Sequence, residues 1–355
     1  VQEQAKQNGF ATAEVQISET ETPLHKLETV YRRAMEQLST ADCFLGAFRS
    51  VIDGWFYGLE EDVLAEGVID GSNEAKLLAR TNDLLEQRLV KVTNTSPTFS
   101  TALRGYRQAH ADGQQAIADG ILAWLSGQPN VAAAAKRFAG VKGDLDHFGA
   151  FNFLQGVLTV LRDSGQAGLL IVLDEVETIQ RVRSDVRDKS LNALRQLIDE
   201  VDSGRFPGLY LLITGTPAFY DGPQGIQRLE PLARRLHVDF QTDSRFDNPR
   251  AVQIRLPAFS LERLGLVGCK VRDIFKEHTA SAERVASFCD DDYVKDLAHA
   301  VAGKLGGKVG VAPRIFLKKL VADVLDRIDQ FPDFNPREHY KLTMNDAEMT
   351  AIERQ

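Results

Sequence analysis

Apolar and polar positions along the chain predict a parallel β-sheet. Residues 10–17 alternate between apolar and polar side chains, which is the pattern of a β-strand. Residues 169–173 and 209–214 are almost continuous apolar runs, typical of strands buried on both faces of a parallel sheet. Another strand is predicted at residues 251–256, ended by Pro257. Because helical segments separate these strands, we expect right-handed crossovers and an α/β fold with a doubly wound parallel sheet.

Helical periodicity dominates the rest of the chain. The helix opened by Thr22 and Pro23 carries its apolar residues on one face: Leu24, Leu27, Val30, Tyr31, Ala34 and Leu38. Residues 42–145 contain helical patterns broken by Gly, Pro and Asn-Thr-Ser turns, and no convincing strand. We interpret them as an all-helical insertion, which either only connects its flanking segments or binds a partner protein.

These patterns divide the chain into a core, an insertion and a C-terminal part. At 355 residues it is long enough for two domains, or for one domain with a large insertion. We expect residues 1–41 and 146–260 to form the α/β core, interrupted by the insertion at 42–145. Residues 261–330 are predicted to form a helical domain, followed by a polar tail at 331–355.

Composition narrows the class of protein. Hydrophobic residues make up 43% and charged residues 26% of the chain, as in soluble globular proteins. No apolar run approaches the roughly 20 residues that cross a bilayer, so we expect no membrane segment. The three cysteines are far apart, which favours a reducing cytoplasm over a disulfide framework. The net charge of −8 argues against nonspecific nucleic-acid binding by the whole surface but allows a local basic patch.

The apolar run at residues 169–173 leads directly into Asp174 and Glu175, the Walker B pattern of P-loop ATPases. Such a strand delivers two carboxylates to the carboxyl edge of the sheet, where open α/β folds bind ligands. Asp174 is predicted to hold Mg²⁺ through its hydration shell, and Glu175 to polarise the water that attacks ATP. The alternative interpretation is a parallel strand that happens to end in acidic residues.

The following strand ends in small hydroxylated residues at the same edge of the sheet. AAA+ ATPases carry there a polar sensor, which lies between the Walker B acid and the γ-phosphate. In the sequence Thr214-Gly-Thr216-Pro, Thr214 is the first candidate for this sensor and Thr216 the second. The alternative is a strand-to-loop turn in which these residues only provide backbone geometry.

Two adjacent arginines, Arg234 and Arg235, precede the strand predicted at residues 251–256. An arginine at this place in AAA+ oligomers projects into the neighbouring subunit's site and stabilises charge on the transferring phosphoryl group. Its planar, permanently charged guanidinium suits this task better than a lysine. The alternative is a solvated arginine at the end of a helix.

The C-terminal helical domain contains a candidate lid helix. Pro313 is expected in the first turn of this helix, with Arg314 and Lys318 on an exposed face. The pattern is that of the sensor 2 helix of a lid domain, whose arginine contacts the nucleotide phosphates. Residues 303–327 hold six Lys or Arg against two Asp, which makes them the best candidate for a basic patch that contacts DNA. The alternative is an ordinary amphipathic helix with a solvated basic side.

The phosphate-binding loop of P-loop ATPases is missing from the chain. No G-x-x-x-x-G-K-[ST] occurs, and residues 303–309 lack the spaced first glycine and the Ser or Thr. Residues 1–8 have the pattern of the last turns of a helix. Since the phosphate loop precedes the first helix in P-loop folds, we expect the first strand and the loop to lie upstream of Val1. The alternative is a degenerate ATPase that never had the motif.

Four stretches of the chain resemble the ATP-binding proteins of bacterial BREX-type phage-defence systems, a family related to AAA+ ATPases of the origin-recognition type. They are Asp174-Glu-Val-Glu-Thr-Ile, the helix from Ser190 to Asp199, Phe206-Pro-Gly-Leu, and Thr214-Gly-Thr-Pro-Ala-Phe-Tyr220. The resemblance extends from Phe10 to about Thr343. It implies that the protein binds ATP and Mg²⁺ and acts with other defence-system proteins against phage DNA.

The resemblance also implies residue roles. Asp174 would take the Mg²⁺ role, Glu175 the water-activating role, Thr214 the sensor role and Arg314 the lid-sensor role. We therefore expect an ATP-hydrolysing switch or motor that acts with partners on DNA, as a homo-oligomer if an arginine acts in trans. The competing hypothesis is a non-catalytic scaffold that binds other proteins through its helical insertion. A third, a signal-transduction NTPase that regulates transcription, predicts C-terminal repeats that the chain does not show.

Overall fold

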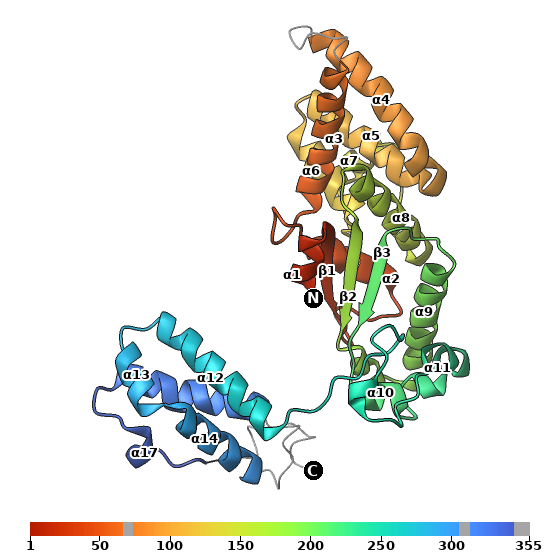
Figure 1. Cartoon of the computed structure of the whole chain (residues 1–355). Helices are drawn as coiled ribbons and strands as arrows, with labels where there is room; N and C mark the ends of the chain where they lie inside the picture. The colour runs from red at the N-terminus through yellow and green to blue at the C-terminus, as the bar shows by residue number, and fades with distance from the viewer. Residues whose placement is uncertain (67–73, 305–312, 344–355) are drawn as a thin grey trace. The chain divides into compact units, whose positions relative to one another are not determined.

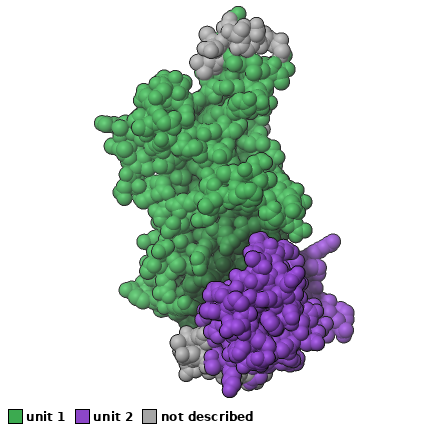
Figure 2. All heavy atoms as spheres, turned by 90° about the vertical axis from the view of Figure 1, so that its left-hand side faces the viewer, with its two compact units in different colours: residues 1–237 green, residues 238–355 purple. Residues whose placement is uncertain are grey.

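The computed structural model describes residues 1–66, 74–304 and 313–343. The chain forms two compact units, residues 1–237 and residues 238–355, which Figure 2 shows in different colours. Each unit has its own apolar core. The two units are described separately below.

Three parallel strands form the sheet of the first unit, in the order β1-β2-β3 (Figure 1). They are β1 (Phe10–Gln16), β2 (Gly168–Asp174) and β3 (Leu209–Ile213), which confirms the strands predicted in these three regions. The central strand β2 is buried from Gly168 to Leu173, and only its last residue is partly exposed. Continuous apolar residues are required there because helices and neighbouring strands cover β2 on all sides.

The strand predicted at residues 251–256 is absent, and that prediction was wrong. Arg255 instead holds the segment in a loop: its guanidinium pairs with Asp247 at 2.8 Å and donates to the carbonyl oxygens of Phe240 and Thr242, both at 3.1 Å. The apolar side chains of the segment are largely exposed: Val252 66%, Ile254 64% and Leu256 88%. Among the described residues the sheet therefore has three strands, and the larger doubly wound sheet is not seen.

Helices cover the sheet and connect its strands. The helix α2 (Leu27–Glu36) follows β1, α8 (His147–Asp163) precedes β2, and α9 (Ser184–Asp202) joins β2 to β3. All six residues expected on the apolar face of α2 and its flanks are buried, although α2 begins at Leu27, after Pro23. The shorter elements of this part of the unit are α1 (Gln2–Gln7), the 3-10 helices η1 (Val176–Gln180) and η2 (Ile226–Arg228), α10 (Pro217–Asp221) and α11 (Glu230–Leu236).

The described part of the region between α2 and α8 contains helices joined by loops, and it contributes no strand to the sheet. Its helices are α3 (Phe48–Ala65), α4 (Glu74–Thr95), α5 (Pro97–Ala111), α6 (Gln115–Leu125) and α7 (Ala133–Phe138). They share one apolar core with the sheet. Asp163 at the end of α8 accepts a hydrogen bond from the Trp55 indole at 2.8 Å and pairs with Arg88 at 2.6 Å. The insertion is therefore anchored to the helix that leads into β2.

The second unit is a helical bundle. Its elements are η3 (Ser244–Phe246), α12 (Leu261–Glu277), α13 (Ala282–Phe288), α14 (Asp291–Lys304), α15 (Pro313–Lys318), the π-helical segment η5 (Lys319–Leu325), α16 (Asp326–Gln330) and α17 (Pro336–His339). Gly268 lets α12 approach the core closely, since a Cβ atom there would lie 2.6 Å from both Phe316 and Val294. The apolar side chains of α12, α14 and α15 consequently interlock.

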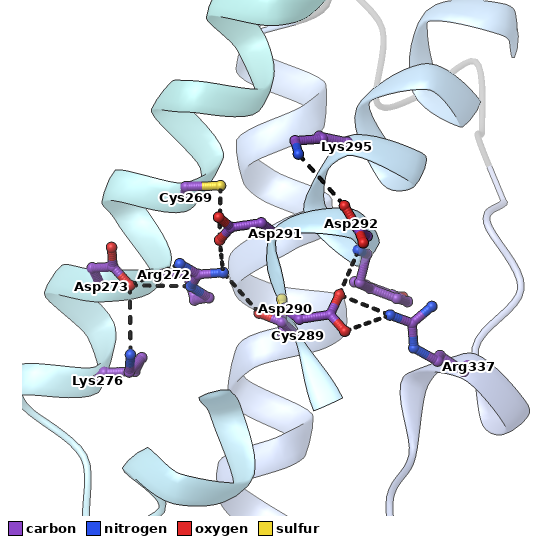
Figure 3. Close-up of polar contacts among 11 residues, drawn as sticks. Cys269, Arg272, Asp273, Lys276, Cys289, Asp290, Asp291, Asp292, Lys295 and Arg337 are labelled. Carbon is purple, nitrogen blue, oxygen red and sulfur yellow. Dashed lines mark hydrogen bonds and ion pairs between the residues drawn. The ribbon is translucent and has the colours of Figure 1, made fainter. Parts of the chain in front are cut away.

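Two arginines tie the start of α14 to other elements of this unit (Figure 3). Arg272 of α12 is only 8% exposed, pairs with Asp291 at 2.6 Å and donates to the Cys289 carbonyl oxygen at 3.2 Å. Arg337 of α17 pairs with Asp290 at 2.8 Å, and this carboxylate accepts a hydrogen bond from the Tyr293 amide. A buried guanidinium is tolerated here because several acceptors surround it.

Replacing Arg272 with Ala is expected to destabilise the second unit by about 2 kcal/mol, because the change removes charge-assisted hydrogen bonds and leaves a space in the bundle. Faster amide hydrogen exchange in α12 and α14 would report this loss. Arg263→Ala is the matched control, since Arg263 is exposed on the same helix. Equal exchange in the two variants would show that the Arg272 contacts contribute no stability.

Candidate functional site

The carboxyl ends of β2 and β3 bring Asp174 and Thr214 together. The Thr214 hydroxyl donates a hydrogen bond to Oδ1 of Asp174. The backbone fixes both residues, because the Thr214 amide donates to the Leu173 carbonyl oxygen at 2.9 Å and the Val176 amide to the Thr214 carbonyl oxygen at 3.4 Å. Asp174 and Thr214 are both half-buried. A carboxylate and a hydroxyl are thus held at the edge where open α/β folds bind ligands.

Glu175 follows in an unusual backbone conformation. Its φ of 56° and ψ of 39° lie in the left-handed region, which few residues other than glycine adopt and which costs roughly 1–2 kcal/mol. The side chain is exposed and lines an open groove of about 760 Å³ together with Thr178 and Arg181 of the neighbouring turn. Backbone strain of this kind concentrates at functional sites, where surrounding contacts enforce it.

Hydrogen bonds hold the turn that contains Glu175 on both sides. The Ile17 amide at the end of β1 donates to the Asp174 carbonyl oxygen at 2.9 Å, and the Thr178 hydroxyl donates to the Ile17 carbonyl oxygen at 3.2 Å. On the β3 side, the Gln180 side chain donates to the Ala218 carbonyl oxygen at 2.9 Å. The turn is therefore fixed between the ends of all three strands, which enforces the left-handed residue.

Glu177 is a further acidic residue at this edge, and the site predictions missed it. Its Oε2 atom is buried and has no hydrogen-bond partner within the described parts of the chain. Burial raises the pKa of Tyr220 to about 12, with a contribution from the negative charge of Glu177. The only sequence signal for Glu177 is its place in the Asp174-Glu-Val-Glu-Thr-Ile stretch.

The second sensor candidate, Thr216, occupies a different position from Thr214. It is the residue before α10, it is half-buried, and its side chain makes no capping hydrogen bond to that helix. Its carbonyl oxygen accepts a hydrogen bond from the Phe219 amide at 2.9 Å. Of the two threonines, it is Thr214 whose hydroxyl is bonded to Asp174.

The chain matches the model of a known protein family. A family model described as BREX system ATP-binding protein BrxC/D matches residues 1–344, which include the whole candidate site. The chain belongs to this family. Neither a curated protein nor a solved structure matches the chain. Membership confirms the resemblance seen in the sequence and associates the chain with ATP binding and with BREX phage defence.

The residues at the strand ends fit the Mg²⁺ ion that an ATP-binding protein of the BREX family implies. The described residues contain no group of three or more His, Cys, Asp or Glu side chains that could hold a metal ion by themselves. Mg²⁺ does not need such a group, because it keeps several waters and binds one or two carboxylates together with substrate phosphates. Asp174, half-buried and oriented by Thr214, fits the role of such a carboxylate.

The two candidate arginine fingers lie on α11 and differ in their contacts. Arg235 forms ion pairs with Asp199 and Asp202 of α9, the latter at 3.3 Å, and so fastens α11 to α9. The Arg234 side chain is 79% exposed and pairs with Glu230 one turn earlier on the same helix. In this BREX family chain, Arg234 is consequently the arginine that can reach another molecule without breaking contacts between helices.

The lid-sensor candidate Arg314 belongs to the second unit. Pro313 begins α15 as predicted, Phe316 is fully buried, and Arg314 and Lys318 are exposed. The predicted basic segment is smaller than expected, because Lys319 is only 5% exposed and pairs with Asp323 at 3.3 Å. Residues 305–312, including Lys308, lie outside the described residues. Within the described residues, no helix has the length and apolar character needed to span a membrane.

Proposed function

We propose that this chain carries the hydrolytic residues of an AAA+-type ATPase that acts as a switch or motor in a BREX defence system. Asp174 would hold the Mg²⁺ of Mg–ATP through water, and the bound ion would supply charge neutralisation at the phosphates. Glu175 accepts a hydrogen bond from the attacking water, and Thr214 orients Asp174 and contacts the γ-phosphate. The observation that carries the proposal is the hydrogen bond between Thr214 and Asp174 across adjacent parallel strands, directly beside the strained Glu175.

In this proposal, a phosphate-binding loop is supplied by a strand that pairs with β3. Among the described residues no strand occupies the outer edge of β3, and Tyr210 on this strand is 64% exposed. The outer edge of β1, in contrast, is closed by a bridge in which Thr12 and Ser39 exchange backbone hydrogen bonds of 2.8 Å. A strand beside β3 would place its phosphate loop at the edge that holds Asp174 and Thr214.

The proposal is tested by measuring phosphate release from ATP by the natural full-length protein and by this chain. We expect turnover by the full-length protein alone. If the full-length protein neither binds nor hydrolyses ATP, the ATPase proposal is wrong, and the chain is better explained as a scaffold that binds other proteins through the helices of residues 42–145.

Thr214→Val in the full-length protein is expected to lower kcat about 10–100-fold, because valine keeps the shape of threonine but cannot hydrogen-bond to Asp174 or to phosphate. Steady-state phosphate release would measure the loss, and thermal unfolding would verify that the fold is intact. Thr216→Val is the matched control and should retain most activity. Similar losses in both variants would contradict the assignment of Thr214 as the sensor.

The residues proposed to sense the nucleotide from a lid and to contact DNA lie in the second unit. Arg314 is proposed as the lid sensor because its side chain is exposed and it follows Pro313, the first residue of α15. With Lys318, it is also the proposed contact for DNA phosphates. If Arg314 and Lys318 contact DNA phosphates, the affinity for duplex DNA should fall steeply as the salt concentration rises. An affinity that stays constant between low and moderate salt would rule out this DNA contact.

A further inference from the structure

An open cavity of about 460 Å³ is lined by α8, α9 and the turn before α2, away from the residues of the candidate ATP site. Four basic side chains line it: His25 before α2, His147 at the start of α8, and Lys189 and Arg195 on α9. The amides of Asn192 and Gln196 line the same cavity. Small-molecule sites typically have volumes of roughly 300–1,000 Å³, so the cavity is large enough for a small organic ligand.

Arginines already pair with the acidic residues of the cavity. Asp188 is bound by Arg228 of η2, with one contact of 3.1 Å, and this guanidinium holds the pKa of Asp188 below its usual range. Asp199 is bound by Arg235 of α11 and also pairs with Arg195 of the cavity, at 3.7 Å. The carboxylates of the cavity are therefore occupied by arginines and do not balance the charge of Lys189.

The basic groups differ in their partners inside the protein. Arg195 pairs with Asp199 at 3.7 Å, and Nε2 of His147 lies 3.3 Å from Oε1 of Gln196. Nδ1 of His25, in contrast, is buried without a hydrogen-bond partner among the described residues. Lys189 is exposed, and no ion pair of its ammonium group is found in the described part of the chain. An ammonium group without a carboxylate partner, beside an imidazole nitrogen without a hydrogen-bond partner, favours an anion, and phosphoryl oxygens are strong acceptors for such donors.

We propose that this cavity binds the phosphoryl group of a phosphorylated small molecule. Lys189 and the rings of His25 and His147 contact the phosphoryl oxygens, while Asn192 and Gln196 hydrogen-bond to the rest of the ligand. The site is separate from the Asp174 site, and its occupancy does not require ATP hydrolysis.

The proposal implies tighter binding at lower pH. Burial, followed by the charges of Lys26 and Lys189, lowers the pKa of His25, against a smaller opposing effect of Glu28. A bound anion favours the imidazolium form, so binding takes up a proton. Affinity should consequently rise as the pH falls from about 8 to about 6.

The test follows the histidine ring NMR signals of this chain during titration with AMP and, separately, with inorganic phosphate. Asp174→Asn serves as the background, so that phosphate bound at the candidate ATP site does not contribute. We expect saturable shifts of the His25 and His147 rings, assigned with His25→Gln and His147→Gln. Lys189→Gln should weaken binding about tenfold, and Lys142→Gln, the same change at an exposed residue outside the cavity, less than about twofold.

Each outcome decides the proposal. Tighter binding of AMP than of phosphate supports a phosphate ester as the ligand, and equal binding supports free phosphate as the source of the same group. The proposal is overturned if neither probe shifts either ring, or if Lys189→Gln and Lys142→Gln weaken binding equally. Loss of ATP turnover in the full-length protein would not affect this result, so the two proposals fail independently.

Discussion

We expect Glu175→Gln to lower the ATP turnover of the full-length protein by about 10²–10⁴-fold while ATP binding is retained. A glutamine keeps the size of the side chain but cannot accept the proton of the attacking water, which is the contribution of a general base. Binding should persist because the phosphates and Mg²⁺ are held by other groups. Phosphate release measures turnover, and a fluorescent ATP analogue measures binding.

The matched control for this experiment is Glu19→Gln. Glu19 is exposed and lines the same groove as Glu175, so its replacement changes the local charge equally. Glu19 does not follow the end of β2, where the attacking water is expected. We therefore expect Glu19→Gln to retain most of the turnover. If Glu175→Gln hydrolyses ATP at the normal rate, Glu175 is not the base, and the strain at this residue needs another explanation.

Arg234→Ala is expected to lower turnover by about 10³-fold or more, the size of effect that arginine fingers have in related phosphoryl transfer. We assign the finger to Arg234 because the contacts of the two arginines on α11 differ. Arg234 is exposed and bound only within its own helix, whereas Arg235 is occupied by Asp199 and Asp202. Arg235→Ala should instead lower the free energy of unfolding, by about 1 kcal/mol, with a smaller loss of turnover.

Mixing two inactive variants tests whether Arg234 acts on a neighbouring subunit. At an interface between an Arg234→Ala subunit and a Glu175→Gln subunit, one site combines an intact Glu175 with an intact Arg234. Partial recovery of turnover on mixing would support action in trans. A mixture as inactive as its components, under conditions where mixed oligomers form, would show that Arg234 is not a finger.

Much of the sheet could be predicted from the sequence because its strands are buried and parallel. Continuous apolar residues at 169–173 have few alternatives to a central strand, and the acids that follow them must then lie at its carboxyl end. The hydroxyl of Thr214 could be placed near Asp174 for the same reason. The structure adds that these two side chains are hydrogen-bonded to each other.

Other features depend on contacts that the local pattern does not contain. Residues 251–256 alternate like a strand, but a strand also needs a partner, and Arg255 instead binds Asp247 and two carbonyl groups. The left-handed conformation of Glu175 could not be predicted either, because hydrogen bonds from distant residues enforce it. The choice between Arg234 and Arg235 similarly depends on acidic residues more than 30 positions away.

The outer edge of β3, which no strand of the described residues covers, also affects how the chain behaves during purification. An uncovered edge strand offers a row of backbone donors and acceptors to any other edge, and Tyr210, 64% exposed, adds apolar surface beside it. Molecules of the isolated chain can therefore associate edge to edge, increasingly so as the protein is concentrated. Light scattering should show larger particles as the concentration of the chain rises.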